Sequence, residues 1–276
     1  MNCPTCGSTG FYSVFGPDCA NQNCSNFKGQ YVYRSAVAPV AKAAPSVAAS
    51  YTIGPGANLS GRNLMGRNLK GANLKGADLS NANLSYVKLW NANLTGADLS
   101  NANLTDANLT DAKLWNANLY GANLSNADLT DASLYKAFLR NADLTGANLT
   151  STNLDGADLT GVDLRGANLG TANLGTAKTL SLANLSGASL SGRDLYDQDL
   201  YGANLSNADL NNADLNGAGL KNADLAGANL RKADLRNADL TGADLNSADL
   251  TVATYDRYTV WPAGFDPVAA GAVYQP

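Results

Sequence analysis

Four cysteines are the clearest candidates for chemistry, and all of them lie within the first 24 residues of the 276-residue chain. Two residues separate the first pair, twelve separate the pairs, and four separate the second pair. Four thiolates at these spacings suit one tetrahedral zinc ion, because zinc favours sulfur ligands and four-coordinate geometry. Iron held by the same thiolates and a pair of disulfide bonds are the alternatives. We predict one structural Zn²⁺ with four ligands: Cys3, Cys6, Cys19 and Cys24.

The residues around the first pair, Cys3-Pro4-Thr5-Cys6-Gly7, resemble a zinc-ribbon knuckle, in which glycine allows the tight turn beneath the metal. The second pair departs from the usual ribbon, because its spacing is longer than two residues. A module of this size cannot fold without a covalent or metal staple, and a zinc-ribbon-like module is predicted at residues 1–34. Residues 35–56 are rich in alanine and proline and are predicted to be an extended linker.

The chain offers few groups for acid-base catalysis. It contains no histidine, and its 23 acidic residues are all aspartate, so the commonest general base is missing. The sequence has no glycine-rich phosphate loop and no nucleophile set beside a base. We therefore predict that the protein is not an enzyme and has no small-molecule substrate.

The formal net charge of −4 is unevenly distributed. Residues 57–193 have a net charge of +1, whereas residues 194–251 have a net charge of −6. The weak overall charge argues against direct binding of nucleic acid. The negative stretch predicts an acidic surface formed by seven residues: Asp194, Asp199, Asp209, Asp214, Asp224, Asp234 and Asp239.

No part of the sequence has the pattern of a membrane or export segment. It lacks a stretch of about 18 to 20 apolar residues and an apolar leader with a basic start. Thiolate metal ligands suit a reducing compartment. We expect a cytoplasmic protein without membrane contact, or a virion-associated one if a phage encodes it.

A repeat of five residues dominates the rest of the chain. Leucine recurs every five residues from Leu59 to Leu174 and again from Leu180 to Leu250, which gives 39 repeats, and alanine stands two places before the leucine in 31 of them. A period of five matches neither a helix face nor a long strand. If alanine and leucine both point inward, the two residues after each leucine must form a corner, and they are usually of types that favour turns. The chain is therefore predicted to wind around an axis with one short side per repeat.

Runs such as Ala92-Asn93-Leu94-Thr95-Gly96 and Ala223-Asp224-Leu225-Ala226-Gly227 resemble the A(D/N)LXX motif of the pentapeptide repeat proteins, and the resemblance covers about 195 of 276 residues. It implies an all-β fold, a right-handed quadrilateral β-helix with four repeats per coil, over residues 57–251. About ten coils at a spacing of about 4.8 Å give a rod about 45 to 50 Å long. Residues 252–276 resemble a tail that follows the repeats in bacterial, especially cyanobacterial, members, and we expect them to cap the last coil.

Eight inward positions that usually hold alanine hold another residue. Two of them, Arg62 and Arg67, belong to the first coil, where a long charged side chain can extend over the open end. The eight residues are Arg62, Arg67, Val87, Thr152, Val162, Lys178, Arg193 and Gln198.

Lys178, Arg193 and Gln198 cluster around a single extra residue that interrupts the repeat after Leu174. A buried charge without a partner is too costly to keep. We therefore expect a bulged coil there, whose long side chains reach solvent or a nearby carboxylate such as Asp194 or Asp197. The irregularity is either a tolerated shift in register or a docking notch.

Aromatic residues recur at matching corners. With four repeats per coil, Trp115 and Tyr135 lie in one column beside the column of Tyr120, and Tyr196 and Tyr201 extend the same two columns once the extra residue is allowed for. Exposed aromatic residues on adjoining faces suggest an interface, although isolated surface aromatics need no such explanation. The candidate interface residues are Trp90, Trp115, Tyr120, Tyr135, Tyr196 and Tyr201.

These features predict a structural or adaptor protein. The rod would serve as a rigid spacer and binding surface, and the cysteine module would tether it to a partner through the linker. The expected partners are proteins, in a homo-oligomer or larger assembly, within a bacterial complex or as a decoration or fibre element of a virion.

The alternative function comes from the family resemblance. Some pentapeptide repeat proteins are acidic rods that mimic DNA, occupy the DNA site of the type II topoisomerase DNA gyrase and protect against quinolones. A resemblance to those proteins would imply a dimer with a strongly acidic surface and many phenylalanines in the central position of the repeat. Here that position is leucine in every counted repeat, and the negative charge is confined to residues 194–251.

Overall fold

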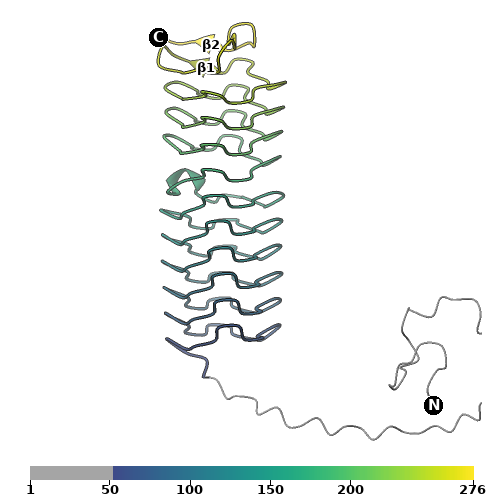
Figure 1. Ribbon diagram of the computed structural model, residues 1–276, viewed down its shortest axis with the longest axis vertical. Coiled ribbons are helices and arrows are strands. Elements are labelled where there is room, and N and C mark those ends of the chain that lie inside the picture. The colour runs from purple at the N-terminus through teal and green to yellow at the C-terminus, as the bar shows by residue number, and fades with distance from the viewer. Residues whose placement is uncertain (1–51) are drawn as a thin grey trace, which may run out of the picture. The chain divides into compact units, whose positions relative to one another are not determined.

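The computed structural model of the chain describes residues 52–276. These residues form a rod in which the chain winds through stacked coils along one axis (Figure 1). Parallel bridges join residues twenty positions apart, such as Asn58 with Asp78 and Asp78 with Asp98. Because a turn follows every five residues, each coil has four sides. The predicted four-sided β-helix is confirmed as the fold of this region.

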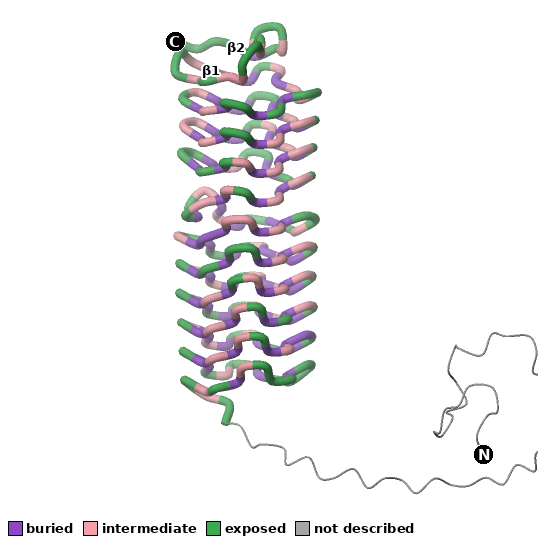
Figure 2. Tube along the Cα trace, viewed as in Figure 1, coloured by how far each residue is buried: buried purple, intermediate pink, exposed green. Residues whose placement is uncertain are grey.

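The interior of the rod consists of leucine and alanine side chains, and buried residues recur along the coils (Figure 2). Leu94, Leu119 and Leu210 are 0% exposed, and Ala92 is equally buried. Side chains alternate across an extended segment, so an inward alanine and an inward leucine leave the residue between them on the outside. Each coil buries its leucines against the coils on either side, which is how a solenoid is stabilised.

Each corner is a tight turn with a defined hydrogen-bond pattern. The N–H of Ala97 donates to the carbonyl of Leu94 at 2.9 Å. Gly96, the third residue of this turn, has a φ of 64°, as a type II turn requires. The residue that follows the alanine also supports the next corner, because Oδ1 of Asp98 accepts the N–H of Ser100 at 2.9 Å. Asparagine provides the same acceptor, which explains why both residue types fill this position.

The residue between alanine and leucine, here called the middle residue, forms one column on each side of the rod. One column contains Phe138, which pairs with Asn118 in the preceding coil and Asp158 in the following one. We call this column, together with the corners on both sides of it, the Phe138 face. Its middle residues in chain order are Asn58, Asp78, Asp98, Asn118, Phe138, Asp158, Thr179, Asp199, Gly219, Asp239 and Val260.

The extra residue changes the spacing of the bridges from 20 to 21 residues, so that Asp158 pairs with Thr179. The chain accommodates it in one turn of 3-10 helix, η1, at Leu174–Thr176. Ala177 is buried and takes the inward position, whereas Lys178 is exposed. The prediction that Lys178 occupies an inward position is therefore wrong, because the inserted residue moves that position back by one.

The tail continues the ladder and then covers the last coil. Strand β1, at Thr254–Tyr255, pairs in parallel with strand β2, at Val273–Tyr274. Trp261 and Phe265 stack with 5.2 Å between their ring centroids and pack against the leucine core. The aromatic rings thus shield the end of the core from water.

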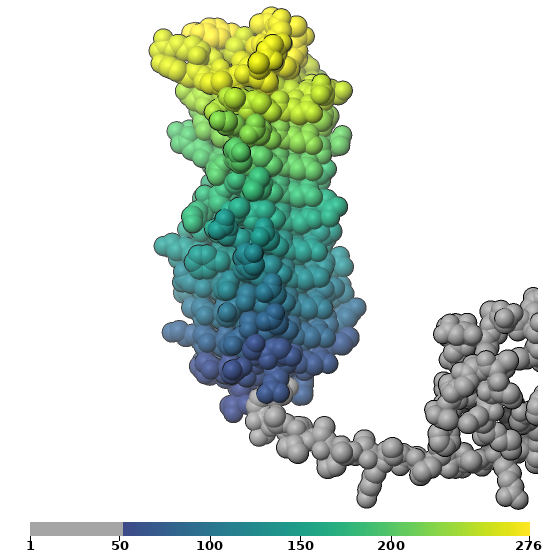
Figure 3. Space-filling model, viewed as in Figure 1, coloured from purple at the N-terminus to yellow at the C-terminus, as the bar shows by residue number. Residues whose placement is uncertain are grey.

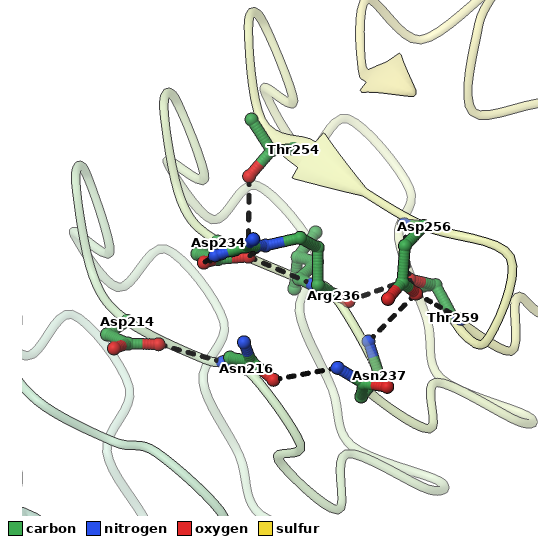
Figure 4. A network of polar contacts seen from close by, with 9 residues as sticks. Asp214, Asn216, Asp234, Arg236, Asn237, Thr254, Asp256 and Thr259 are labelled. Atoms are coloured by element: carbon green, nitrogen blue, oxygen red, sulfur yellow. Dashed lines mark hydrogen bonds and ion pairs between the residues drawn. The ribbon is translucent and has the colours of Figure 1, made fainter. Parts of the chain in front are cut away.

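Polar contacts also fix this cap to the coils below it (Figure 4). Oδ1 of Asp256 accepts the N–H of Asn237 at 3.0 Å, and the Thr254 hydroxyl donates to Asp234 at 3.4 Å. The side-chain amide of Asn237 donates to Oδ1 of Asn216 at 3.0 Å. The first two of these bonds join the tail directly to the coil below it, and the third joins that coil to the one before.

Candidate protein-interaction surface

Large apolar side chains gather in the middle of the Phe138 face. Trp115 and Tyr120 lie at the two corners that flank this face in one coil. Tyr135 and Phe138 belong to the next coil. Trp115, Tyr120 and Phe138 are 43%, 49% and 49% exposed. The coils stack into one continuous rod from whose surface side chains project (Figure 3). The structure thus brings three predicted interface residues together and adds Phe138 to them.

Ser133 orients the indole of Trp115. Its hydroxyl accepts the indole N–H at 2.7 Å, which holds the ring against the next coil. A hollow of about 280 Å³ borders Trp115 and Tyr135. A second hollow, of about 420 Å³, borders Lys136 and Phe138. The corner formed by Tyr135 and Lys136 therefore has a hollow on each side, into which a partner can insert side chains.

Cations lie beside these rings. The ammonium nitrogen of Lys136 is 4.9 Å from the centroid of the Tyr135 ring, and Arg140, two residues after Phe138, is exposed. In the coil of Phe138 these two cations have no carboxylate beside them on this face, while Asp155 of the next coil lies close enough to interact with the charge of Lys136.

Asp158 is the buried carboxylate of this region, with Lys178 3.7 Å away. Its burial acts to raise its pKa, but hydrogen bonds from the Thr160 hydroxyl and N–H, together with the charges of Lys178 and Arg140, leave the pKa below its ordinary value. The carboxylate is therefore ionised at neutral pH and neutralises Lys178 locally.

Tyr196 and Tyr201 lie farther along the same two corners and are 54% and 46% exposed. Leu182, whose N–H donates to the carbonyl of Tyr201 at 2.8 Å, is 55% exposed. It has a φ of 59°, which is unusual for leucine. Trp90 is not part of this group, because it lies on another corner with the Lys70 ammonium 3.6 Å from its ring centroid.

The seven aspartates of the predicted acidic surface are spread over all four sides. Grouped by column, they are Asp194, Asp214 and Asp234; Asp199 and Asp239; Asp209; and Asp224. Each of the seven accepts, through Oδ1, the N–H of the residue two positions later. These carboxylates therefore stabilise their own corners, and no single side of the rod collects them.

Hydrogen bonds lower the pKa of two members of this set. The guanidinium of Arg236 is the main cause at Asp234, followed by the backbone N–H of the same residue and its charge, and these outweigh the opposing effect of burial. At Asp239 the main cause is the hydroxyl of Thr241. Both carboxylates are better stabilised in the folded rod than in water.

The ladder opens on two adjoining sides next to η1. Bridges join Asn148 with Asn168 and, one coil later, Ser189 with Asp209, but within residues 52–276 none joins Asn168 with Ser189. We call this opening, lined by residues 172–176 and 192–194, the Arg193 gap, and its volume is about 260 Å³. The other two sides keep one bridge each across the inserted residue, Asp158 with Thr179 and Asp163 with Asn184, so the coils stay connected.

Arg193 spans the gap. Its Nη1 donates to the carbonyl of Ala172 at 2.9 Å, and its Nη2 donates to the carbonyl of Gly170. We expected Arg193 to reach solvent or an aspartate, and instead it binds backbone carbonyls of the neighbouring coil. The guanidinium therefore takes over part of the bonding that the ladder provides elsewhere.

Gln198 also differs from the prediction that its head group reaches solvent or an aspartate. It is 3% exposed, and its Nε2 has no hydrogen-bond partner in the part of the chain that the structure describes. Lys178, by contrast, reaches solvent and a nearby carboxylate as expected, although its partner is Asp158 and not Asp194 or Asp197. The inserted residue leaves Lys178 beside the preceding coil, away from the aspartates that follow it in the sequence.

The predicted metal ligands Cys3, Cys6, Cys19 and Cys24 lie outside the described residues. From residue 52 onward, the structure contains no cluster of three or more potential ligand side chains that could hold a metal ion. No helix in the same range is long and apolar enough to cross a bilayer. Arg62 and Arg67 are exposed, as predicted for the first coil.

Phe138 was not among the candidate interface residues predicted from the sequence, yet a signal for it exists. The middle residue is Asn or Asp in 32 of the 39 repeats. Three of the exceptions, Lys113, Ser133 and Phe138, lie next to Trp115 or Tyr135. The full set of exceptions is Lys88, Lys113, Ser133, Phe138, Thr179, Ser189 and Gly219.

Comparison with known proteins adds a family and several similar folds. The family model described as pentapeptide repeats matches residues 55–85, 63–101, 107–146, 142–178, 180–217 and 218–253. HetL, a pentapeptide repeat protein involved in heterocyst differentiation regulation from the cyanobacterium Nostoc sp. strain PCC 7120, is 37% identical over 69% of this chain and 81% of that chain, with a TM-score of 0.37. QnrB1, a plasmid-mediated fluoroquinolone resistance protein, is 21% identical over 79% of this chain and 89% of that chain, with a TM-score of 0.40. Among curated proteins, none matches the chain.

Proposed function

Since the chain belongs to the pentapeptide repeat family, we propose that it is a non-enzymatic rod that binds a protein partner through the middle of the Phe138 face. The right-handed β-helix of the family supplies a rigid support on which side chains recur at fixed spacing. Binding on such a support costs little ordering entropy, because the backbone is already held by the ladder.

One observation carries the proposal. The side-chain amide or carboxylate of the middle residue normally accepts the N–H of the following corner. Lys113, Ser133 and Phe138 lack such a group. These losses surround Trp115 and Tyr135, where large rings are exposed and hollows lie beside them. Loss of corner bonds where apolar surface is exposed is the pattern expected when binding, and not stability, selects the residues.

The cysteine module adds a tether to this function. One Zn²⁺ held by Cys3, Cys6, Cys19 and Cys24 would fold residues 1–34 and let them dock on a second site. Metal analysis of the purified protein tests this part, with one zinc per chain expected. Absence of zinc and iron from freshly purified protein would remove the tether from the proposal.

The DNA-mimic alternative receives less support from the geometry. A mimic needs carboxylates aligned along one side of the rod, whereas the seven candidate aspartates occupy four columns and serve as corner acceptors. Mixing the full-length protein with DNA gyrase and measuring the mass by light scattering tests this alternative. A stable complex would favour it and would direct mutation to residues 194–251.

A photo-crosslinking experiment tests the proposed surface. A photoreactive phenylalanine analogue placed at position 138 should capture a protein partner in cells that express the chain natively. The matched control is the same analogue at Lys88, which is also an exposed middle residue but lies in another column. The proposal fails if position 138 captures nothing or if both positions capture the same proteins equally.

A further inference from the structure

We propose that the partner bound by the Phe138 face is a second copy of this chain, docked face to face in antiparallel orientation. This inference rests on the proposed function, because it names the partner of the same surface. The two-fold axis would lie in the interface at a right angle to the rods, between the coil of Asp158 and the coil of Thr179. Both copies then contribute the same residues, as in the isologous interfaces of most dimers.

Symmetry decides which residues meet in this pair. A two-fold axis in the interface reverses the order of the coils but keeps each corner opposite the same corner of the other copy. The coil of Phe138 therefore faces the coil of Asp199, since each lies the same number of coils from the axis. Corners that stack along one edge of the rod form a corner column. Lys136 and Asp197 are each the second residue of a corner in the same column, with φ values of 54° and 52°. They therefore become neighbours across the interface.

Charge complementarity is the first argument for this register. The coil of Phe138 presents two exposed cations on this face, Lys136 and Arg140, and no carboxylate. The coil of Asp199 presents two exposed carboxylates, Asp197 and Asp199, and no cation. The antiparallel pair brings these coils together twice, once on each side of the axis, so Lys136 lies opposite Asp197 in both places and Arg140 lies diagonally opposite Asp199.

The second argument is the placement of aromatic residues on both sides of the insertion. Tyr135 and Tyr196 occupy the same corner column and would meet across the interface, where aromatic pairs add to the energy of burial. Arg140 would face Tyr201, an arrangement that favours a cation–π contact. Register across the insertion is kept on this side of the rod, because the 21-residue spacing leaves Asp158 bridged to its neighbour.

The edges of the contact fit as well. Trp115 would face Asn216, since both are first residues of the same corner column. Tyr120 would face Lys221. Five coil spacings separate Trp115 from Lys221, or about 24 Å at about 4.8 Å per coil. A contact of this length is at the small end of specific interfaces, so the dimer is expected to dissociate on dilution.

An acidic segment of another protein would use only half of this surface. It would satisfy Lys136 and Arg140 but would be repelled by Asp197 and Asp199 on the same face. A second copy uses both charge sets at once, which is why we favour it over a different acidic partner.

Sedimentation velocity of the full-length protein at several concentrations tests the pair. The mass should rise from 28.5 kDa toward twice that value, and high salt should lower the dimer fraction. Lys136→Asp and Asp197→Lys should each weaken self-association about tenfold or more, because each places like charges opposite one another. An equal mixture of the two variants should form dimers again, since every contact in the mixed pair joins opposite charges.

The matched control is Lys88→Asp, which changes the same charge at an exposed position in another column and should leave the mass unchanged. Restoration in the mixture also excludes misfolding of the single variants. A wild-type protein that stays monomeric, single variants that dimerise as well as wild type, or a mixture that stays monomeric would overturn the inference. If the wild type is monomeric but position 138 crosslinks another protein, the proposed function stands without the dimer, whereas failure of the crosslink removes both.

Discussion

Residues 113–179 and residues 194–251 build their coils from the same repeat but fill its middle position differently. In residues 194–251 every middle residue except Gly219 is Asn or Asp and accepts the N–H of its corner. In residues 113–179 the acceptor is missing at Lys113, Ser133 and Phe138, next to exposed rings. The exposed rings of residues 194–251, Tyr196 and Tyr201, instead follow middle aspartates that keep their corner bonds. A coil can lose a corner bond because its neighbours hold the ladder on both sides. A middle residue can therefore be replaced by one that binds a partner, provided that the coils on both sides keep their hydrogen-bonded ladder.

Acid should weaken both groups of coils and is expected to have the largest effect. The Thr241 hydroxyl lowers the pKa of Asp239. At Asp128 burial acts to raise the pKa, but hydrogen bonds led by those from Thr130 lower it overall. A lowered pKa contributes stability that is complete above the unfolded-state value of about 3.9 and is lost as the pH falls through the folded value. In urea titrations we expect the free energy of unfolding to change little between about pH 7 and pH 5 and to fall steeply below about pH 4.

The matched control for acid is Asp239→Asn, which keeps the Oδ1 acceptor but cannot be protonated in this range. Its free energy of unfolding should therefore fall less than that of the wild type between pH 5 and pH 3. A variant that falls as steeply would show that this corner bond does not depend on the carboxylate charge.

Arg193 lies where the two groups of coils meet, and its removal should have the next largest effect. Arg193→Ala removes the guanidinium donor from the carbonyls of Ala172 and Gly170. Bonds from charged donors are worth about 1.5 to 3 kcal/mol, and partial exposure reduces this to an expected loss of about 1 to 2 kcal/mol. The control is Arg165→Ala, which breaks an exposed ion pair with Asp163 and should cost much less, because solvent screens exposed ion pairs. Equal losses in urea unfolding would mean that Arg193 does not join the coils.

Gln198 offers a gain in stability at the same junction. Its buried Nε2 lacks a partner in the described region, so Gln198→Met should raise the free energy of unfolding by about 1 kcal/mol. Methionine keeps most of the volume, whereas Gln198→Ala restores the usual residue but leaves a cavity if the insertion has widened the coil. A loss of stability in Gln198→Met would imply that the amide is hydrogen-bonded, for example to a buried water.

What the sequence could predict depends on the range of the interaction that decides each feature. The period of five predicts the coils and columns, because every coil repeats the same local contacts, and Tyr201 lies at the corner expected for it even after the insertion. The place where the extra residue is absorbed depends on two coils at once, so the pattern alone assigned Lys178 to the inward position that Ala177 occupies. Binding of Arg193 to carbonyls of the preceding coil is likewise a consequence of a gap that no single repeat reveals.

The smallest expected change in stability comes from Phe138, the middle residue that differs most from those of residues 194–251. Phe138→Asn restores the usual middle residue, whose Oδ1 can accept the N–H of Arg140, and removes an exposed ring. We expect a gain of about 0.5 kcal/mol in urea unfolding, because one local hydrogen bond is added and no core contact is lost. The same change should weaken partner binding, since the ring borders one of the two hollows. The reverse change, Asn118→Phe, adds a ring one coil away in the same column and should lose more stability, because Asn118 both accepts the N–H of Tyr120 and donates to Oδ1 of Asp98. If Phe138→Asn were destabilising instead, the Phe138 ring would contribute to the stability of the fold, and its presence on this face would not need binding to explain it.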